Sequence, residues 1–418
     1  MKSMVANPPL DILALAPLPY EASGRAVLNR GVAVFYAELL PRLVSLGHHV
    51  RVLAEARPQD QVGEGSGVRG SLPGVSVEWS ALRYHPGASS PPDAERARFA
   101  AEVGEILDRE IGKRRPDVVL FGREPLAVAG VAACRRHGLP VALVCHGVAL
   151  AELEEGRYGA GHAADLLRCL GQMDLVLAIA RHIEERLLRI TRAPVKTIRN
   201  AVDVGHFRPR RRDRSLAAQL GLDEHHLVVG HVSNLRPVKR PFDLVDAAAE
   251  TLRHRDGVVF LLVGDGPHRA GVEAEVSRRG LSASFRFAGE IPHRAMPAYL
   301  NLCDVVLLTS EREGLPLSGL EAQACARVLL ASDLPATREI VIDGETGALF
   351  PVGDVDAISR RLLELFADRS RRVALGRRAR ETRAREGLGD WASAYSSALT
   401  DLFNAGTRRA AAKESAVG

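Results

Sequence analysis

The 418-residue sequence is poor in aromatic residues and has no long hydrophobic run. Aromatic side chains make up 5% of it, which argues against a stacking platform for single-stranded nucleic acid. Its uninterrupted apolar runs, such as Val258–Val263, are far shorter than the ~20 residues that span a membrane. The segment Met1–Pro9 is too short and too polar for a signal peptide. We therefore expect a cytoplasmic protein that binds no nucleic acid, with peripheral membrane contact as an open alternative.

Cysteine and lysine are also scarce. The five cysteines are an odd number, widely spaced, and none forms a CxxC pair. Neither a disulfide framework nor a zinc site is predicted, and a reducing compartment fits. Lysine and arginine together number 56, of which only five are lysine. A lysine inside a distinctive motif is therefore notable in this chain.

Short apolar runs alternate with amphipathic helical stretches along the whole sequence. Hydrophobic residues make up 46% and charged residues 26%, which is an ordinary globular mixture. Helices are predicted over 31–46 and 94–114. Strands are predicted over 11–16, 50–54, 75–79, 118–121, 141–145 and 175–180, and again over 227–232, 258–263, 285–288, 305–309 and 328–331. This alternation predicts an α/β protein with two doubly wound, Rossmann-like parallel sheets.

The two series of strands predict two domains. We expect residues 1–205 to form one domain and residues 206–390 the other. A C-terminal helix over about 390–418 is expected to pack back on the first domain. Between the two series, Arg208–Arg214 is polar and strongly basic, which fits a solvated linker or a contact with acidic lipid or a phosphorylated substrate. Ligands of such sheets bind at the carboxyl ends of the strands.

The segment Leu307–Glu321 is the most informative. An apolar strand ends at Ser310, two acids follow, and a Gly–Leu–Pro turn leads into a helix that carries Glu321. A strand-to-helix turn is a natural phosphate seat because backbone N–H groups and the helix dipole point at it. The carboxylates of Glu313 and Glu321 can accept hydrogen bonds from hydroxyls on either side, as a sugar nucleotide would offer. An ordinary strand–turn–helix with a plain early-helix acid remains the alternative.

Three further segments end strands of the predicted sheets. Gly230–Pro241 concentrates basic residues and contains Lys239, the only lysine between Lys196 and Lys413. An ammonium suits a pyrophosphate oxygen, although a solvated loop charge is the alternative. His146 ends the strand over 141–145, where it faces a ligand or serves as a hydrogen-bonded structural residue. Leu261–Pro267 runs into a Gly–Asp–Gly turn, a weak signal alone.

Together these segments resemble glycosyltransferase family 4, whose members are retaining, nucleotide-sugar-dependent enzymes with the GT-B fold, two Rossmann-like domains facing across a cleft. The resemblance rests on five matches in the family's order: Gly31 sixteen residues before Gly47–His48, the segment Asn200–Pro209, the basic loop Ser233–Lys239, the turn Val263–Pro267, and the E-x7-E pair Glu313 and Glu321. The loop SNLRPVKR is most similar to that of N-acetylglucosaminyl-malate synthases.

The resemblance implies that residues 1–205 form an acceptor-binding domain and residues 206–390 a nucleotide-sugar-binding domain. It also implies roles residue by residue. Glu313 would bind the donor sugar beside its anomeric carbon, Glu321 the ribose hydroxyls, and Lys239 the pyrophosphate. His146 would contact the donor sugar, and with Glu313 and Lys239 it makes up the expected catalytic set. The remaining donor-binding residues implied are Gly31, Asn234, Arg236, Gly264, Ile291 near the base, and Gly314, Leu315 and Leu317 at the phosphate.

Two positions depart from the family's pattern. Asn234 stands where the family has an arginine, so Arg236 would supply the charge. Arg30 precedes Gly31 where the family has a second glycine. The pair Asp354 and Asp356 is read as a helix cap with a first-turn acid rather than as a metal site.

The function expected from the resemblance is transfer of a glucose- or N-acetylglucosamine-type sugar from a UDP-sugar to a small-molecule acceptor. We expect retention of configuration and neither metal nor cofactor. One alternative is a GDP-mannose-dependent mannosyltransferase acting on a lipid, docked through Arg208–Arg214 and Arg369–Arg383. Another is a sugar-nucleotide binder without activity. The acceptor would be set by loops at 17–30, 63–91 and 149–161.

Overall fold

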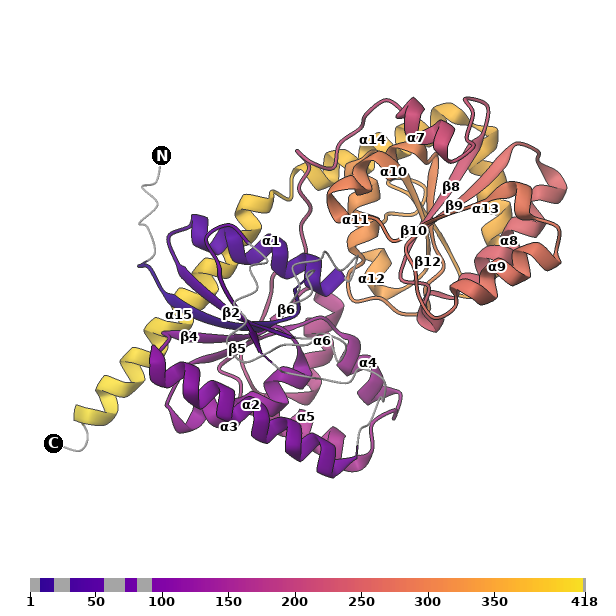
Figure 1. The fold of residues 1–418 in the computed structure, drawn as a ribbon. Coiled ribbons are helices and arrows are strands. Elements are labelled where there is room, and N and C mark those ends of the chain that lie inside the picture. Colours follow the sequence, from indigo (N-terminus) through magenta and orange to yellow (C-terminus); the bar gives the residue numbers. More distant parts are fainter. Residues whose placement is uncertain (1–7, 19–30, 56–71, 81–91, 416–418) are drawn as a thin grey trace, which may run out of the picture. The chain divides into compact units, whose positions relative to one another are not determined.

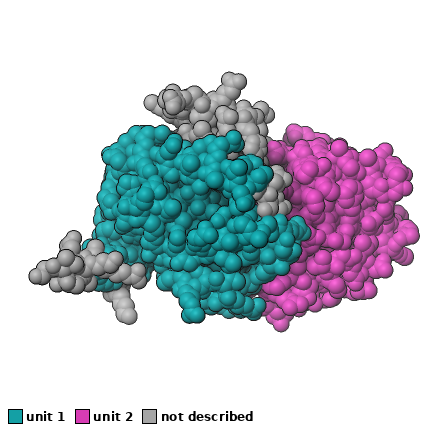
Figure 2. All heavy atoms as spheres, turned by 90° about the horizontal axis from the view of Figure 1, so that it is seen from below, with its two compact units in different colours: residues 1–27, 32–199, 389–418 teal, residues 28–31, 200–388 magenta. Residues whose placement is uncertain are grey.

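The computed structural model describes residues 8–18, 31–55, 72–80 and 92–415. The chain divides into two compact units, coloured separately in Figure 2. Unit 1 comprises residues 1–27, 32–199 and 389–418, and unit 2 comprises residues 28–31 and 200–388. Each unit is built on one sheet, and every recorded strand pair within it is parallel. Each unit is described by itself below.

The sheet of unit 1 has the strand order β3-β2-β1-β4-β5-β6-β7. Its central strands β1, β4 and β5 are buried at every position, as expected for a parallel sheet covered on both faces. The seven strands are β1 Asp11–Ala16, β2 His49–Glu55, β3 Ser76–Ser80, β4 Val118–Phe121, β5 Val141–Cys145, β6 Leu175–Ala178 and β7 Val195–Thr197.

The helices of unit 1 cover both faces of this sheet (Figure 1). α1 and α15 lie on one face, while α2, α3 and α5 lie together on the other. The helices are α1 Gly31–Ser45, α2 Asp93–Lys113, α3 Glu124–Arg136, α4 Val148–Glu154, α5 Ala160–Gly171, α6 Arg181–Ile190 and α15 Leu388–Ser415, whose residues from Gly389 onward belong to this unit.

α15 is held to unit 1 by aromatic packing and one buried hydrogen bond. The rings of Trp391 and Tyr395 meet the edge of Phe35 at centroid distances of 5.2 and 5.8 Å. His48 accepts a hydrogen bond from the Leu10 N–H through Nδ1, so its Nε2 carries the proton and donates to Ser396 Oγ at 2.7 Å. The C-terminal helix α15 is thus part of the core of unit 1, which also contains the N-terminal strands.

The sheet of unit 2 has the strand order β10-β9-β8-β11-β12-β13, and the order reverses at β8. β8 and β11 are registered at only two residue pairs, and their pairing ends at Gly230 and Val306. Both strands continue for two residues beyond that point. Because the strand order reverses at β8, a topological switch point lies between the carboxyl ends of β8 and β11. The strands are β8 Leu227–Val232, β9 Val258–Val263, β10 Phe285–Gly289, β11 Val305–Leu308, β12 Val328–Ser332 and β13 Ala348–Phe350.

Helices also cover both faces of the second sheet (Figure 1). α8, α9 and α13 pack together on one face, and α10, α11 and α14 on the other. The α-helices are α7 Arg214–Gln219, α8 Pro241–His254, α9 Arg269–Arg278, α10 Met296–Leu302, α11 Leu317–Ala324, α12 Pro335–Arg338, α13 Val355–Ala367 and α14 Arg369–Ala384; the 3-10 turns are η1 Pro237–Lys239, η2 Ser282–Ser284 and η3 His293–Ala295.

The predicted elements correspond closely to the observed ones. The strands over 11–16, 118–121, 141–145, 227–232 and 258–263 are confirmed residue for residue, and the others differ by one or two residues at their ends. The prediction missed β7 and β13, because three residues are too few to make a recognisable apolar run. Asp354 caps α13 by accepting the N–H of Ala357 at 2.8 Å, as predicted. All five cysteines are buried and free.

Among the described residues, no helix is both long and apolar enough to cross a membrane. The basic run Arg208–Arg214 is mostly exposed, yet Arg212 forms an ion pair with Asp304 at 2.8 Å and hydrogen-bonds the carbonyl of His226. Part of this predicted linker is therefore fastened to unit 2.

Candidate active site

Two glycines bring the loops after β8 and β9 into backbone contact. A Cβ atom on Gly264 would lie 1.9 Å from the carbonyl oxygen of Ser233, and one on Gly266 would lie 1.8 Å from that of Asn234. Gly264 also has a φ of +121°, which is unfavourable for residues with a side chain. The predicted Gly–Asp–Gly turn therefore serves to seat the basic loop Ser233–Lys239 against β9.

Gly266→Ala tests this seating. We expect it to destabilise unit 2 by roughly 1–3 kcal/mol, the typical cost of overpacking, and to displace the basic loop. Thermal unfolding of the variant checks the expectation. Gly112→Ala is the matched control, because a Cβ there meets nothing within 4 Å and the residue lies inside α2. A melting temperature equal to that of the wild type would show that the loops are not held by this contact.

The basic loop is held in an unusual backbone conformation. Leu235 and Arg240, which flank η1, have φ values of 38° and 46°. Such left-handed values are uncommon for residues other than glycine and cluster at functional sites. Leu235 is buried, whereas Arg236 is exposed. Asn234 Oδ1 is buried and accepts no hydrogen bond from the described residues.

Lys239 and Glu313 form an ion pair at the carboxyl ends of β8 and β11. Lys239 Nζ donates to Glu313 Oε1 at 2.7 Å, and Ser310 Oγ donates to the same oxygen at 2.6 Å. Thr309 Oγ1 donates to the Lys239 carbonyl at 2.7 Å, which fixes the backbone beneath the pair. Both donors use Oε1, so among the described residues Glu313 Oε2 has no recorded donor and Lys239 Nζ has no second recorded acceptor.

Glu321 lies on α11, and one of its carboxylate oxygens also accepts a hydrogen bond from a protein side chain. It is 6% exposed, and its Oε1 lies 2.6 Å from His293 Nε2, which donates to it. His293 belongs to η3, two residues after the buried Ile291, and its ring is 5.3 Å from that of Phe207. One oxygen of Glu321 is thus held by the protein, and no hydrogen bond from a described residue is recorded for the other.

The turn between Glu313 and Glu321 is anchored from the segment Asn200–Pro209. Asn200 Nδ2 donates to the carbonyl of Leu315 at 3.2 Å, and its buried Oδ1 accepts no hydrogen bond from the described residues. Leu315 itself is buried. α11 begins at Leu317, and the first N–H groups of a helix have no partner within it. The N–H groups of Gly319 and Leu320 already donate to the Pro316 carbonyl at 3.1 and 3.2 Å. The phosphate-binding role of the turn Gly314–Leu317 stays a prediction.

His146 lies in unit 1, directly after β5. It is 7% exposed, its Nε2 is 3.4 Å from Tyr36 Oη, and its ring meets the edge of Phe35. Burial, assisted by the charge of Arg123, lowers the pKa of His146 to about 3, so the imidazole is neutral. Its predicted contact with the donor sugar stays a prediction. Gly31 begins α1, and Arg30 lies outside the described residues.

Unit 2 brings together most of the residues implied for donor binding. Lys239 and Glu313 form their ion pair at the switch point. The turn before α11 follows Glu313 in the chain, and Glu321 lies on α11 itself. Sequence reasoning missed three side chains that hold them, Ser310, Thr309 and His293. It also missed His231, which contacts the Leu307 carbonyl and Ser233. His231 lies near the carboxyl end of β8, and a histidine at a strand end is the signal that singled out His146.

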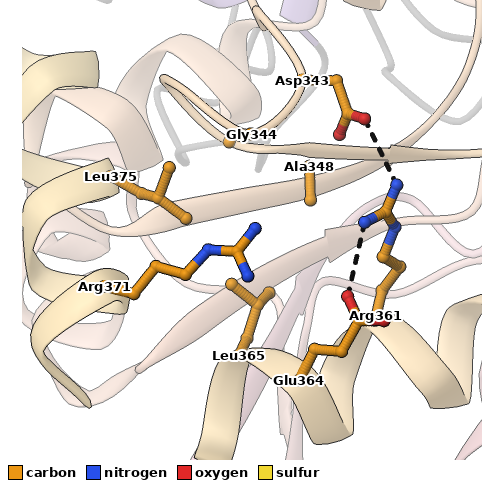
Figure 3. A pocket seen from close by; sticks show the side chains of 9 residues that line it. Asp343, Gly344, Ala348, Arg361, Glu364, Leu365, Arg371 and Leu375 are labelled. Atoms are coloured by element: carbon orange, nitrogen blue, oxygen red, sulfur yellow. Dashed lines mark hydrogen bonds and ion pairs between the residues drawn. The ribbon is translucent and has the colours of Figure 1, made fainter. Parts of the chain in front are cut away.

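A small pocket elsewhere in unit 2 contains none of these residues (Figure 3). Arg361 lines one side of the pocket and bridges Asp343 and Glu364. Its volume of about 10 Å³ is that of a single water, so it is too small for a substrate.

Comparison with known proteins gives the family. The model of glycosyltransferase family 4 matches residues 29–206, and the model of glycosyl transferases group 1 matches residues 213–382. The chain belongs to these glycosyltransferases. The predicted recognition and the α/β, two-domain Rossmann-like fold class are thereby confirmed.

Three curated relatives illustrate the range of this glycosyltransferase family. The N-acetyl-alpha-D-glucosaminyl L-malate synthase of Bacillus anthracis is 30% identical over 50% of the chain and 55% of its own length, so the match spans about half of that relative. A D-inositol 3-phosphate glycosyltransferase of Kribbella flavida is 28% identical over 88% of the chain and 89% of its own length. A GDP-mannose-dependent phosphatidylinositol monomannoside mannosyltransferase of Mycolicibacterium smegmatis is 29% identical over 66% and 73%.

A solved structure supports the fold. The Anabaena protein HepE, crystallised with UDP and glucose, superposes with a TM-score of 0.73 over 94% of the chain and 99% of its own length. The sequence identity is 19%, so this likeness bears on the fold alone.

Proposed function

We propose that this glycosyltransferase transfers a glucose- or N-acetylglucosamine-type sugar from a UDP-sugar to a small-molecule acceptor, with retention and with neither metal nor cofactor. The observation that carries the proposal is the pair of carboxylates. Glu313 and Glu321 each have one oxygen held by protein donors and one available, and the turn into α11 lies between them in the chain.

The chemistry of a nucleotide sugar matches this order of groups. The available oxygen of Glu313 accepts hydrogen bonds from sugar hydroxyls, and that of Glu321 accepts them from the ribose. Lys239 and the N–H groups at the start of α11 bind the two phosphates. The buried Oδ1 atoms of Asn234 and Asn200 are further acceptors, and leaving them unpaired would cost roughly 1–3 kcal/mol each.

The reaction we propose proceeds at the front face of the donor. The acceptor oxygen bonds to the anomeric carbon as the bond from that carbon to the phosphate oxygen breaks, and the acceptor proton passes to a phosphate oxygen of the leaving UDP. Negative charge grows on the pyrophosphate in the transition state. Lys239, Arg236 and the helix dipole of α11 stabilise it, so cationic side chains take the role that a metal has in other transferases.

The relatives support a small hydroxylated acceptor. Two of them are named for transfer to malate and to inositol 3-phosphate. The five buried, free cysteines suit a reducing cytoplasm, where we place the reaction. Of the predicted acceptor loops, residues 19–30, 63–71 and 81–91 lie outside the described residues. The third loop, residues 149–161, is described, and in it Tyr158 Oη donates a hydrogen bond to Glu152 Oε2 at 2.8 Å.

A GDP-mannose-dependent mannosyltransferase acting on a lipid is the second candidate, favoured by the name of the mycobacterial relative. Exposed arginines such as Arg369 and Arg377 suit an anionic membrane. Other arginines of that stretch are committed to the fold, since Arg372 donates to the Leu365 carbonyl and Arg383 pairs with Glu386. This weakens the case for a continuous basic face.

Calorimetric titration with UDP and then GDP tests the proposal. We expect the wild type to bind UDP at micromolar strength and Glu321→Ala to bind it at least about 10-fold more weakly, since a charged hydrogen bond to the ribose is lost. Glu364→Ala, on α13, is the control that should bind like the wild type.

The outcomes separate the candidates. Preference for GDP would favour the mannosyltransferase. Binding of UDP without turnover of any UDP-sugar on a broad acceptor panel would favour a non-catalytic binder. Absence of nucleotide binding would remove the transferase proposal.

A further inference from the structure

A buried histidine lies where the pairing of β8 and β11 ends. His231 is 1% exposed and follows Gly230, the last β8 residue registered with β11. Its Nδ1 is 3.0 Å from the carbonyl oxygen of Leu307, which follows Val306, the last β11 residue registered with β8. Leu307 is registered with Leu330 of β12 but has no recorded register partner in β8, so the imidazole links the two strands beyond their last recorded pair.

The contacts of His231 fix the positions of its protons. A carbonyl oxygen only accepts hydrogen bonds, so Nδ1 must carry the proton that faces Leu307. In a neutral ring Nε2 is then the acceptor, and it lies 2.8 Å from Ser233 Oγ. The Ser233 hydroxyl therefore donates to His231, which leaves its oxygen to accept the N–H of Leu235 at 3.2 Å.

The charge state agrees with this assignment. Burial lowers the pKa of His231 to about 4, and the nearby Lys239 adds to the effect, while the hydrogen bond to Leu307 opposes it. The ring is thus neutral near pH 7. A protonated ring would offer two donors, and Ser233 Oγ would have to accept from both His231 and Leu235 with its own proton redirected.

This chain of hydrogen bonds ends at Leu235, in the part of the basic loop that has a left-handed backbone conformation. Leu235 has the left-handed φ of 38°, and its N–H is held by Ser233 while its carbonyl accepts the N–H of His268 at 3.1 Å. Four residues later the same loop presents Lys239. On the other side, Leu307 leads within three residues to Thr309 and Ser310, which hold Lys239 and Glu313.

We propose that His231, acting through Ser233, is a positioning residue of the donor site. It fixes the basic loop relative to the end of β11, so that Lys239 and Glu313 are already in register when the nucleotide binds. The proposal rests on the donor site described under the proposed function. Its consequence is that loss of the imidazole weakens nucleotide binding in a protein that remains folded, although His231 itself touches no ligand.

Three variants at His231 separate its two hydrogen bonds. His231→Phe keeps a ring and removes both. His231→Asn retains a donor near the position of Nδ1, and His231→Gln retains a polar group near that of Nε2. We expect His231→Phe to weaken UDP binding about 10-fold at a temperature where it is fully folded, and the two amide variants to recover part of that loss. Ser233→Ala should have a similar effect, and the double variant should be no worse than His231→Phe, because the two residues act as one unit.

Leu362→Ala is the matched control for lost stability. Leu362 is fully buried in the core of unit 2 on α13, so its truncation lowers the melting temperature without touching this chain of hydrogen bonds. Its UDP affinity should equal that of the wild type. If His231→Phe melts lower but binds UDP within twofold of the wild type, the residue is merely structural and the proposal is overturned.

Amide hydrogen exchange in the unliganded protein distinguishes this failure from failure of the proposed function. Faster exchange at Leu235 in His231→Phe, but not in Leu362→Ala, is expected whichever nucleotide the wild type prefers. If the wild type binds GDP instead, the same ratio is measured with GDP. Unchanged exchange at Leu235 would overturn the positioning of the basic loop by His231. A wild type that binds neither nucleotide would remove the proposed function and with it the donor-site role of His231, even if exchange at Leu235 becomes faster.

Discussion

Replacing Lys239 by methionine should lower the rate of UDP release from a UDP-sugar by about 10²–10³-fold. Methionine keeps much of the side-chain volume but removes the ammonium group that pairs with Glu313 at 2.7 Å. The growing charge of the leaving pyrophosphate then loses a preorganised partner, and the Glu313 carboxylate loses one of its two donors. Donor hydrolysis can be followed without knowing the acceptor, by coupling UDP release to a chromogenic assay.

Lys196→Met is the control for this substitution. Lys196 is an exposed residue of β7 in unit 1, so the same change of side chain there should leave the rate unaltered. A loss of less than about tenfold in Lys239→Met would mean that Arg236 or the α11 dipole carries most of the stabilisation, and the catalytic role given to Lys239 would be wrong.

The stability of the folded protein should fall steeply between pH 6.5 and 5. Burial lowers the pKa of His48, brings that of His146 to about 3 and that of His231 to about 4. Burial lowers the pKa of His162 as well. The unfolded chain therefore takes up protons near pH 6.5 that the folded protein does not. Glu124 works in the opposite direction, because burial raises its pKa and it is protonated first in the folded state. His146 and His231 alone account for two protons, which correspond to about 2.7 kcal/mol of unfolding free energy lost per pH unit.

Urea unfolding followed by circular dichroism at pH 7.5, 6.0 and 5.0 measures this slope. Substitution of one of the buried histidines by asparagine should flatten it by about one proton, or about 1.4 kcal/mol per pH unit. His254→Asn is the control, since His254 is an exposed residue of α8 and should leave the slope unchanged. An unfolding free energy that is level from pH 7.5 to pH 5.0 would contradict the burial of these rings in their neutral form.

The sequence predicts the long strands and the order of the site segments, because both depend on residues near one another in the chain. A run such as Val258–Val263 is readable as a buried strand, and Glu313 and Glu321 are linked by their spacing on one strand–turn–helix. Contacts between residues far apart in the sequence could not be predicted. His293 lies 28 residues from Glu321, and His231 lies 76 residues from Leu307, so only the fold brings them together.

His146 shows a different limit. Its place at the end of a strand is visible in the sequence, but whether a strand-end side chain faces a ligand or packs inward depends on its neighbours. Here the rings of Phe35 and Tyr36, more than a hundred residues away in the chain, enclose it. Periodicity within one strand carries no information about such neighbours.

The return of α15 to unit 1 determines the order in which the two units are completed during synthesis. Residues 200–388 are continuous in sequence and contain the whole second sheet, so unit 2 has all its strands once they leave the ribosome. Unit 1 has its strands earlier, yet the face around Phe35 stays uncovered until Trp391 and Tyr395 emerge. The half of the protein that is made first is therefore finished last, and a ribosome that stalls before residue 391 holds an apolar surface open to chaperones.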